Sequence, residues 1–466
     1  MDLNRGRQAL FAALAALALI VAACGPSGGS ASPAGSIGVS APPATTGSST
    51  EPSAGVSEGP TVAPSESSAA SPSGGGQIGG TVTVIGVWGG SEQESFLAMV
   101  KPFEETTGIK VEYTGTRDLN AVLTTGVASG LLPDLAGFTP GLTAGFVESG
   151  ALKPLDDVLD MATYKAETAP ALTDLVTVDG KTFGVFIKAA LKGLIWYNPK
   201  VYSGGAPTSF DALMQAPASG DTKRWCVGLE SGAASGWPAT DWIEDILIRQ
   251  AGPEVYDKWV RGEQKWTSPE IKAAFETFGR VVADDNVFGG SNAVLTTNFG
   301  DAGNPLFTNP PGCEFHHQAS FITDFFKKQG GAADGDFDFF PMPDINPQFS
   351  GAVSGVGDLF GMFNDTPQAR ALIAYLVTPE AQAIWVGRGG ALSANSKVTN
   401  YPDDVSKRSA EILASAKIFR FDGSDLMPEA MNNAFWKAML DFTKDQAKLD
   451  AILGELDDVQ ASAYGG

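Results

Sequence analysis

The residues that first suggest chemistry lie in the stretch GLESGAASGWPATDWIEDIL, residues 228–247. It carries two tryptophans, Trp237 and Trp242, beside the carboxylates of Asp241, Glu244 and Asp245. An aromatic ring offers an apolar face for stacking, and a carboxylate accepts hydrogen bonds from hydroxyl groups. A ligand with an apolar face and a rim of hydroxyl groups needs both features, so this stretch is a candidate binding loop.

Other candidate side chains follow the first two expected strands. Trp88 ends an apolar strand predicted over residues 82–87, and two glycines follow it. Arg117 and Asp118 come after a second strand in GIKVEYT. Open α/β sheets place their ligands at the carboxyl ends of parallel strands, so all three are binding candidates. The alternatives are that Trp88 covers the first helix and that Arg117 pairs with Asp118.

Three charged residues beside glycines are further candidates. Asp301 follows a glycine in TTNFGDAG, where a helix cap is the alternative. Asp358 lies among apolar and glycine residues, where a carboxylate is costly unless it is paired or used. Arg388 precedes two glycines and either reaches a ligand or neutralises carbonyls at a helix end.

The elements that position these residues alternate between strands and helices. After the first strand, apolar residues recur at helical spacing, and the second strand then completes a β-α-β opening. Pro238 suits the first turn of a helix that runs to about residue 251, which puts Trp237 just before it. Trp242 lies beside the apolar face of this helix, so packing is its alternative role. Asp179 and Gly180 predict a turn between extended segments.

The N-terminus is typical of an exported lipoprotein. Arg5 and Arg7 precede an apolar run over residues 9–23, which is short for a membrane span but suits a secretory signal. The run ends in VAAC, which resembles the bacterial lipobox, so residues 1–23 are a predicted signal peptide and Cys24 the lipidation site. An ordinary signal peptide with an accidental cysteine is the alternative. Residues 24–79, rich in Gly, Ser and Pro, predict a disordered tether.

The remaining cysteines, Cys226 and Cys313, predict a disulfide, because an even pair in an exported chain favours one. Two buried free thiols are the alternative. No spacing of cysteine and histidine indicates a metal site, and His316 and His317 are neighbours that point in different directions in any regular element. The stretch DGDFDFFPMPDI has alternating aspartates but lacks the glycine and glutamate of a calcium loop, which leaves calcium elsewhere open.

Composition narrows the class of partner. The 466 residues have a formal net charge of −22, so a nucleic acid would be repelled over most of the surface. Hydrophobic residues make up 43% of the chain, enough for a well-packed core in one large or two medium domains. We expect a folded protein that binds no nucleic acid.

Several segments together resemble a known family. LPDLAGF, VDGKTFGVF, LIWYNPKVY, APTSFDALM and LVTPEAQAIWVGRGGALSANSKV are similar, in order and spacing, to the extracellular solute-binding proteins (family 1 type) of carbohydrate ABC transporters. The resemblance extends from about residue 80 to the end. Residues 228–247, with RWCVGL, NFGDAGNPLFTNPPGCEFHHQASF and FRFDGSDLMPEAMNNAFWKAML, resemble the α-glucoside-binding subgroup.

The resemblance implies an α/β fold of the two-lobed periplasmic-binding-protein type II, maltose-binding-protein-like, with a ligand cleft between the lobes. One lobe would comprise residues 80–189 and 353–392, and the other residues 190–352 and 393–466. It also implies a sugar contact for Trp436 and supports those of Asp301 and Asp358. No cofactor or metal is expected.

The expected function is capture without catalysis. A membrane-anchored substrate-binding protein would bind a sugar, an α-glucoside oligosaccharide by resemblance, on the outer face of the cell membrane. It would act as a monomer and deliver the sugar to ABC permease subunits and their ATPase. The sequence leaves two alternatives open, an anchored glycan-binding adhesin and a glycoside hydrolase, because a hydrolase needs only two suitably spaced carboxylates among 53 acidic residues.

Overall fold

The computed structural model describes residues 78–215 and 221–465. The sheets and helices described below belong to one compact unit, Gly74–Gly466. The predicted signal peptide, the predicted lipidation residue Cys24 and the tether up to residue 77 lie outside the described residues.

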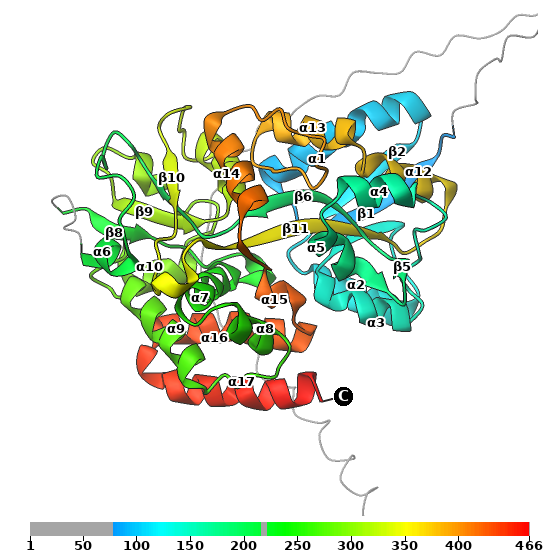
Figure 1. Ribbon diagram of the computed structural model, residues 1–466. Helices are drawn as coiled ribbons and strands as arrows, with labels where there is room; N and C mark the ends of the chain where they lie inside the picture. Colours follow the sequence, from blue (N-terminus) through cyan, green and yellow to red (C-terminus); the bar gives the residue numbers. More distant parts are fainter. Residues whose placement is uncertain (1–77, 216–220, 466) are drawn as a thin grey trace, which may run out of the picture. The chain divides into compact units, whose positions relative to one another are not determined.

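The larger sheet has the order β12-β11-β3-β1-β2, and β6 pairs with β11 as well. β1 runs parallel to β2 and β3, which confirms the predicted β-α-β opening, whereas β11 runs antiparallel to β3 and β6. Figure 1 shows β6 and β11 side by side across the middle of the molecule. The strands of this larger sheet are β1 (Thr81–Gly86), β2 (Lys110–Gly115), β3 (Leu135–Phe138), β6 (Val185–Leu191), β11 (Ala352–Met362) and β12 (Ile418–Phe421).

The smaller sheet has the order β10-β7-β9-β8. Its strands are β7 (Leu194–Tyr197), β8 (Lys223–Cys226), β9 (Cys313–Gln318) and β10 (Asp338–Pro341). A separate hairpin joins β4 (Thr177–Val178) to β5 (Lys181–Thr182). Its turn residues Asp179 and Gly180 have φ angles of 50° and 78°, which confirms the predicted turn.

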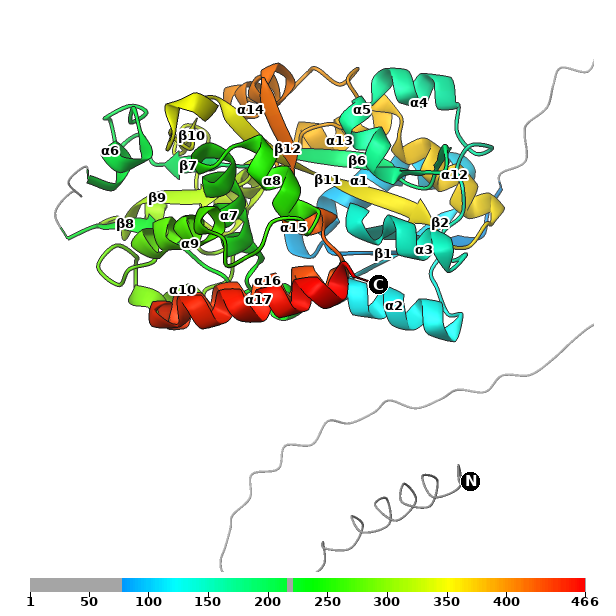
Figure 2. The same cartoon turned by 60° about the horizontal axis from the view of Figure 1, so that its bottom comes forward.

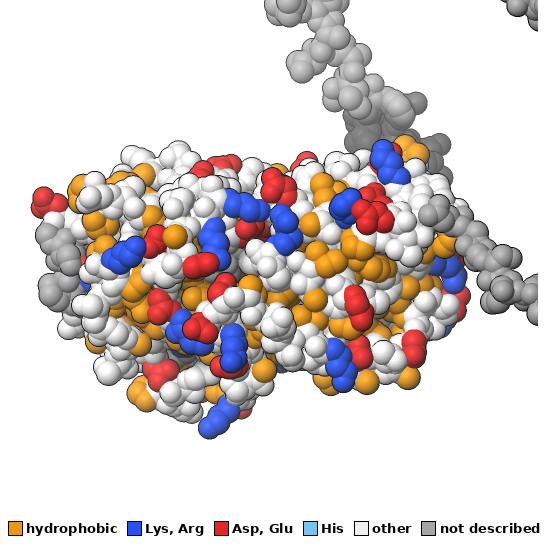
Figure 3. Space-filling view, turned by 90° about the horizontal axis from the view of Figure 1, so that it is seen from above, with side chains coloured by type: hydrophobic (Ala, Val, Ile, Leu, Met, Phe, Trp, Pro, Cys, Tyr) orange, Lys and Arg blue, Asp and Glu red, His pale blue; other side chains and the backbone are white. Residues whose placement is uncertain are grey.

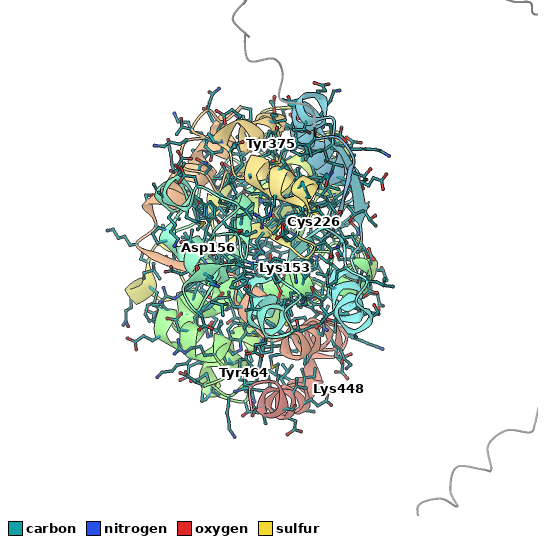
Figure 4. All side chains as sticks on the ribbon, turned by 90° about the vertical axis from the view of Figure 1, so that its right-hand side faces the viewer. Lys153, Asp156, Cys226, Tyr375, Lys448 and Tyr464 are labelled. Carbon is teal, nitrogen blue, oxygen red and sulfur yellow. A yellow bond between two sulfur atoms is a disulfide. The ribbon has the colours of Figure 1, made fainter. Side chains whose placement is uncertain are left out.

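Helices cover both sheets. Those packed with the larger sheet and its surroundings are α1 (Gly90–Thr107), α2 (Leu119–Ser129), α3 (Thr143–Glu148), α4 (Met161–Glu167), α5 (Pro170–Thr173), α12 (Pro367–Leu376) and α13 (Pro379–Arg388). Tyr375, labelled in Figure 4, ties α12 to α1 by donating a hydrogen bond from its hydroxyl to the carbonyl oxygen of Met99 at 2.8 Å.

The other helices surround the smaller sheet and the connection between the sheets. Figures 1 and 2 show α16 and α17 packed side by side, beneath α7 in Figure 1. These helices are α6 (Phe210–Gln215), α7 (Trp237–Gln250), α8 (Pro253–Val260), α9 (Pro269–Val281), α10 (Gly290–Thr296), α11 (Thr323–Lys328), α14 (Asp404–Ser415), α15 (Gly423–Leu426), α16 (Glu429–Lys444) and α17 (Leu449–Ala463).

Helix α7 is the element that the sequence predicted to begin near Pro238. Pro238 lies in its first turn, and the helix ends at Gln250, one residue before the predicted end. Trp237 is the first helical residue, whereas the sequence placed it just before the helix. Side chains all round α7 are buried, because the helix packs between β11, β9, α9 and α16.

The chain passes from the larger to the smaller sheet through Lys192 and Gly193, between β6 and β7. It returns through β11, whose residues 352–355 also pair with β12. β12 lies in a segment that the sequence assigned to the second lobe, yet it joins the larger sheet because β11 extends through the crossing. The lobe boundaries themselves stay a prediction.

A substitution at Gly193 would measure how tightly the chain is packed where it crosses between the sheets. Its φ is 70°, and a Cβ atom there would lie 2.8 Å from Asp245 Oδ1 and 2.9 Å from an Arg249 nitrogen. We expect Gly193→Ala to lower the free energy of unfolding by about 2 kcal/mol in urea denaturation, because it adds crowding to left-handed strain. At Gly180 the φ is also positive, but no atom lies within 4 Å of an added Cβ atom. Gly180→Ala should therefore lower the free energy of unfolding by only about 1 kcal/mol, through the left-handed strain alone. Equal costs for the two variants would contradict tight packing at the crossing.

The predicted disulfide is confirmed. Cys226, labelled in Figure 4, is bonded to Cys313, with their Cα atoms 5.6 Å apart. The bond joins β8 to β9, which are parallel neighbours in the smaller sheet.

The surface carries both signs of charge despite the large negative net charge. Figure 3 shows Lys and Arg side chains interspersed with Asp and Glu over the face that it views. Within residues 78–215 and 221–465, no helix combines the length and the apolar character needed to cross a membrane.

Candidate functional site

A cavity of about 540 Å³ lies between the elements of the two sheets. This volume falls within the range of about 300 to 1,000 Å³ that is usual for small-molecule sites. From the larger sheet's side, the ends of β1 and β3, the start of α2 and the middle of β11 line it. From the other side, the loop before α7, the first turns of α7 and α16, and Phe299 and Phe321 line it.

One wall of the cavity is aromatic. The Trp237 ring lies 5.1 Å from Phe299 and 6.1 Å from Phe321, measured between ring centroids. Gly236 explains how Trp237 reaches this position. Its φ is 109°, and a Cβ atom there would lie 2.3 Å from the carbonyl oxygen of Trp436, so only glycine lets the start of α7 approach α16 this closely.

Trp436, on α16, also lines the cavity. Its Nε1 is buried and has no hydrogen-bond acceptor within the described part of the chain. A buried indole N–H without an acceptor is unfavourable, so this donor is suited to a ligand oxygen.

Strand β6 and the residue directly after it supply the floor of the cavity. Lys188, Ala190 and Lys192 line it, at the two-residue spacing of side chains on one face of an extended strand. Both lysines are buried, with side chains 3% and 4% exposed. Each therefore needs carboxylate partners.

Lys188 is held by carboxylates from α1 and β11. Its Nζ lies 2.8 Å from Glu92 Oε1 and 3.4 Å from Asp358 Oδ2. Burial alone would lower the pKa of Lys188, but Asp358 and Glu92 raise it, so the side chain is charged at neutral pH. The ammonium also lies 4.7 Å from the ring centroid of Trp385.

Lys192 is surrounded by more carboxylates than its one charge can balance. Its Nζ lies 2.7 Å from Asp241 Oδ1 and 3.7 Å from Glu244 Oε2, and it donates a short hydrogen bond to Asp422. Asp425 interacts with it electrostatically. Asp241, Glu244 and Asp422 stand close enough to share one cation, and the Lys192 ammonium is that cation.

The pKa shifts follow from this imbalance. Burial raises the pKa of Asp241 to about 7, although Lys192 opposes the shift. Burial likewise raises the pKa of Asp425 to about 7 and raises that of Glu244. Burial alone would lower the pKa of Lys192, but the carboxylates of Asp241 and Glu244 raise it. Burial therefore moves the pKa of both aspartates from the acidic range toward neutrality, which favours their protonated forms.

A second ionic group ties α7 to the crossing strands without lining the cavity. Asp245 accepts hydrogen bonds from Arg249 at 3.0 Å and from Ser354 of β11, and it lies 2.7 Å from His317 Nε2. Burial alone would raise the pKa of Asp245, but Arg249 and His317 lower it to about 2. This carboxylate therefore stays charged, and its partners are complete.

The two sides of the cavity also touch around its rim. The Arg117 guanidinium lies 4.9 Å from the centroid of the Phe299 ring. Thr124 of α2 donates to Glu429 of α16 at 3.2 Å, and Lys328 of α11 lies 3.4 Å from Glu94 of α1. These contacts join elements of the larger sheet to elements of the smaller one, so they depend on how closely the two sides approach.

Seven of the predicted contact residues line this cavity, although they are far apart in sequence. Trp88 contributes little open surface, because it is 2% exposed and its ring packs against Trp385 at 4.7 Å. Asp118 is the exposed N-cap of α2, and Asp241 lies one turn after Trp237 on α7. The seven are Trp88, Arg117, Asp118, Trp237, Asp241, Asp358 and Trp436.

The other three predicted residues lie outside the cavity. Trp242 is 1% exposed and stacks on His317, with 4.1 Å between ring centroids, so its packing role prevails. Asp301 is exposed and accepts a hydrogen bond from the Asn304 side chain, which is a local turn contact. Arg388 donates to the Ser95 hydroxyl of α1 at 3.1 Å, and this contact directs it away from the ligand space.

The sequence interpretation missed Lys188, Lys192, Phe299 and Phe321. A signal for the lysines was present in VFIKAALKGL, where two cations interrupt an otherwise apolar strand. Phe299 precedes Gly300 and Asp301 in the loop that supplied a candidate, but there the carboxylate was preferred to the ring. No local signal distinguishes Phe321 from the other phenylalanines of its segment.

The chain is similar to known binding proteins. Residues 98–414 match the model of a family described as bacterial extracellular solute-binding protein. The chain is 37% identical over 372 residues to the osmoprotective compounds-binding protein GgtB of Synechocystis sp., covering 78% of this chain and 88% of that protein. It is 36% identical over 395 residues to the alpha-glucosides-binding periplasmic protein AglE of Rhizobium meliloti, covering 81% and 86%.

Solved structures support the fold. A chitin oligosaccharide binding protein superposes with a TM-score of 0.73 at 19% sequence identity, covering 83% of this chain and 99% of that one. The predicted α/β, two-lobed fold of the periplasmic-binding-protein type is confirmed. The family and both relatives are described as binding proteins, in agreement with the expectation that the chain is not an enzyme.

Proposed function

Because the chain belongs to the family of bacterial extracellular solute-binding proteins, we propose that it is the sugar-binding component of an ABC importer. It captures an α-glucoside outside the cell membrane and delivers it to the permease subunits. The observation that carries this proposal is the cavity between the lobes, where the rings of Trp237, Phe299 and Trp436 stand opposite charged groups from β6, β11 and α2.

The chemistry of the lining suits a sugar. A pyranose presents an apolar face that stacks on Trp237 or Trp436, and its hydroxyl groups bond to carboxylates and to the free indole N–H. Asp118, Asp241 and Asp358 supply acceptors, and Arg117 and Trp436 supply donors. The α-glucoside is proposed because the chain is 36% identical, over 395 residues, to a relative named for binding alpha-glucosides.

Capture is proposed to favour the closed arrangement of the lobes. A sugar that touches Trp237 on α7 and Asp358 on β11 stabilises the state in which both groups face one cavity. The rim contacts of Arg117 with Phe299 and of Thr124 with Glu429 form in that same state. Opening breaks them and releases the sugar to the permease.

The test is a thermal-shift screen of the purified protein with glucose, maltose, trehalose, sucrose, maltotriose and lactose. A ligand that binds only the folded state raises the melting temperature by mass action. We expect a clear rise with at least one α-glucoside, and a constant sugar concentration over hours. No rise with any of these sugars would contradict the proposed function, and release of free glucose would favour the hydrolase.

Membrane anchoring is proposed through Cys24. The lipobox-like VAAC and the following Gly/Ser/Pro-rich segment support it, since several acyl chains give stable anchoring. In a bacterial host, the protein is expected in the membrane fraction and Cys24→Ser in the soluble extracytoplasmic fraction. An unchanged distribution of Cys24→Ser would contradict lipidation at this residue. A monomer is expected in both cases.

A comparison of Asp301 with Asp358 tests which residues belong to the binding site. Its side chain is exposed and outside the cavity, so Asp301→Asn should change the affinity for maltose or trehalose by less than about twofold in calorimetry. Asp358→Asn, at the cavity floor beside Lys188, should weaken binding by more. A larger effect of Asp301→Asn than of Asp358→Asn would move the site toward the loop after α10.

A further inference from the structure

The cavity floor holds two buried lysines, Lys188 on β6 and Lys192 directly after it, and their charges are balanced unequally. Lys188 has Glu92 and Asp358 as partners, and Arg117 lies 3.9 Å from Glu92, so this group is close to neutral. Lys192 faces four carboxylates, and no second cation of the described residues is paired with them. We call these five residues the Lys192 cluster: Lys192, Asp241, Glu244, Asp422 and Asp425.

Four residues of the Lys192 cluster are buried and Asp425 is half-buried, and the hydrogen bonding of the cluster is incomplete. Asp241 is 3% exposed and Glu244 is fully buried. Asp241 Oδ2 and Glu244 Oε2 have no hydrogen-bond partner among the described residues. Asp241, Asp422 and Asp425 line the cavity, so the excess negative charge borders the space that a ligand would fill.

The elements packed around the cluster do not supply the missing positive charge. On α7, Arg249 is already paired with Asp245. His317 on β9 is also paired with Asp245, and burial lowers its pKa. Burial raises the pKa of Tyr256 on α8, so its hydroxyl keeps its proton. On β11, Asp358 adds negative charge.

We propose that ligand capture in this cavity is coupled to the uptake of a proton by the Lys192 cluster. This inference rests on the proposed function and adds a regulation to it: affinity for a neutral sugar falls as pH rises through neutrality. The proton resides on the cavity-lining carboxyl of Asp241 or Asp425.

The sign of the effect follows from desolvation. A neutral sugar and the closed lobes remove water from Asp241 and Asp425 without bringing a charge, and desolvation favours the protonated form of a carboxyl group. Both groups already have pKa values of about 7 because of burial, so a further rise lies in the accessible range. The complex then holds more protons than the free protein, and binding weakens as protons become scarce.

Calorimetry measures this coupling directly. We would titrate the purified protein with maltose, trehalose and sucrose at about pH 6 and about pH 8.5, in buffers of different ionisation enthalpy. Proton uptake appears as a dependence of the binding enthalpy on the buffer near neutral pH. We expect the dissociation constant to increase about three- to tenfold between the two pH values.

Variants of Asp241 and Asp425 test whether the Lys192 cluster takes up the proton. Asp241→Asn and Asp425→Asn remove the two titrating groups, and each is expected to reduce the proton uptake and flatten the pH dependence, whatever its effect on affinity. Asp301→Asn, a matched change outside the cavity, is expected to keep both. The pair of cluster variants keeps the test available if one of them does not fold.

The outcomes separate this inference from the proposed function. Sugar binding with no proton exchange, or with proton release, would overturn the coupling and leave the receptor function standing. Undiminished uptake in both cluster variants would also overturn it, because the proton would then bind elsewhere. No binding of any of the three sugars at either pH would contradict the proposed function itself.

Discussion

Lys192→Met is expected to lower the free energy of unfolding by about 3 to 5 kcal/mol at neutral pH, the usual cost of removing one partner from a buried ion pair. Lys192 is the cation shared by Asp241, Glu244 and Asp422, whose side chains are at most 6% exposed. Without the ammonium, these carboxylates are left buried without a counter-charge. Urea denaturation followed by circular dichroism measures the loss.

The cost of Lys192→Met should depend on pH. Burial raises the pKa of Asp241 and of Asp425 to about 7, whereas an unfolded aspartate has a pKa near 3.8. The folded state therefore holds more protons than the unfolded state between about pH 4 and pH 7, and these two groups lower the stability as pH rises through that window. Without Lys192 the unpaired carboxylates are more costly when charged, so the variant should lose more stability at about pH 7.5 than at about pH 5.

Lys200→Met is the matched control. Lys200 pairs with Asp336, but its side chain is 71% exposed, so its loss should cost less than about 1 kcal/mol. A Lys192→Met variant that is no less stable than Lys200→Met would show that the lysine is not needed as a counter-charge. A loss independent of pH would assign the effect to packing.

Trp237→Ala is expected to weaken binding of the sugar by about 2 to 3 kcal/mol, or on the order of 30- to 150-fold. Trp237 lines the cavity, and its ring lies beside those of Phe299 and Phe321. Its loss removes the proposed stacking surface without removing a charged group. Calorimetric titration with the sugar selected in the thermal-shift screen measures the change.

Two controls show whether a loss of affinity in Trp237→Ala comes from the loss of the aromatic ring. Trp237→Phe keeps an aromatic face and should retain most of the affinity. The far-ultraviolet circular dichroism and the melting temperature without sugar establish that the alanine variant is folded. A folded Trp237→Ala protein with unchanged affinity would remove Trp237 from the site and leave it a packing role against Phe299.

Local sequence was enough to predict several elements that the structure contains. Pro238 and the apolar spacing after it predicted α7 to within one residue at each end. Asp179 and Gly180 predicted the hairpin turn because both adopt positive φ at low cost there. The pairing of Cys226 with Cys313 followed from their number in an exported chain.

Only the tertiary structure shows which of the two tryptophans in α7 lines the cavity and which is packed in the core. Trp237 and Trp242 are five residues apart, so they point about 140° apart around the helix. Asp241, four residues after Trp237, lies on the same side as Trp237, and both line the cavity. Periodicity showed that the two tryptophans diverge, but only the packing of α7 decided which of them faces the cavity.

The sequence by itself determined the β-α-β opening, the position of α7, the family and seven of the residues that line the cavity, because propensity, turn chemistry and segment resemblance are local properties. Only the tertiary structure decided which charges are buried together. Lys192 meets Asp241 and Asp422 across separations of 49 and 230 residues. Such partners depend on how β6, α7 and the segment before α15 pack, and the desolvation that shifts their pKa values exists only in that packed arrangement.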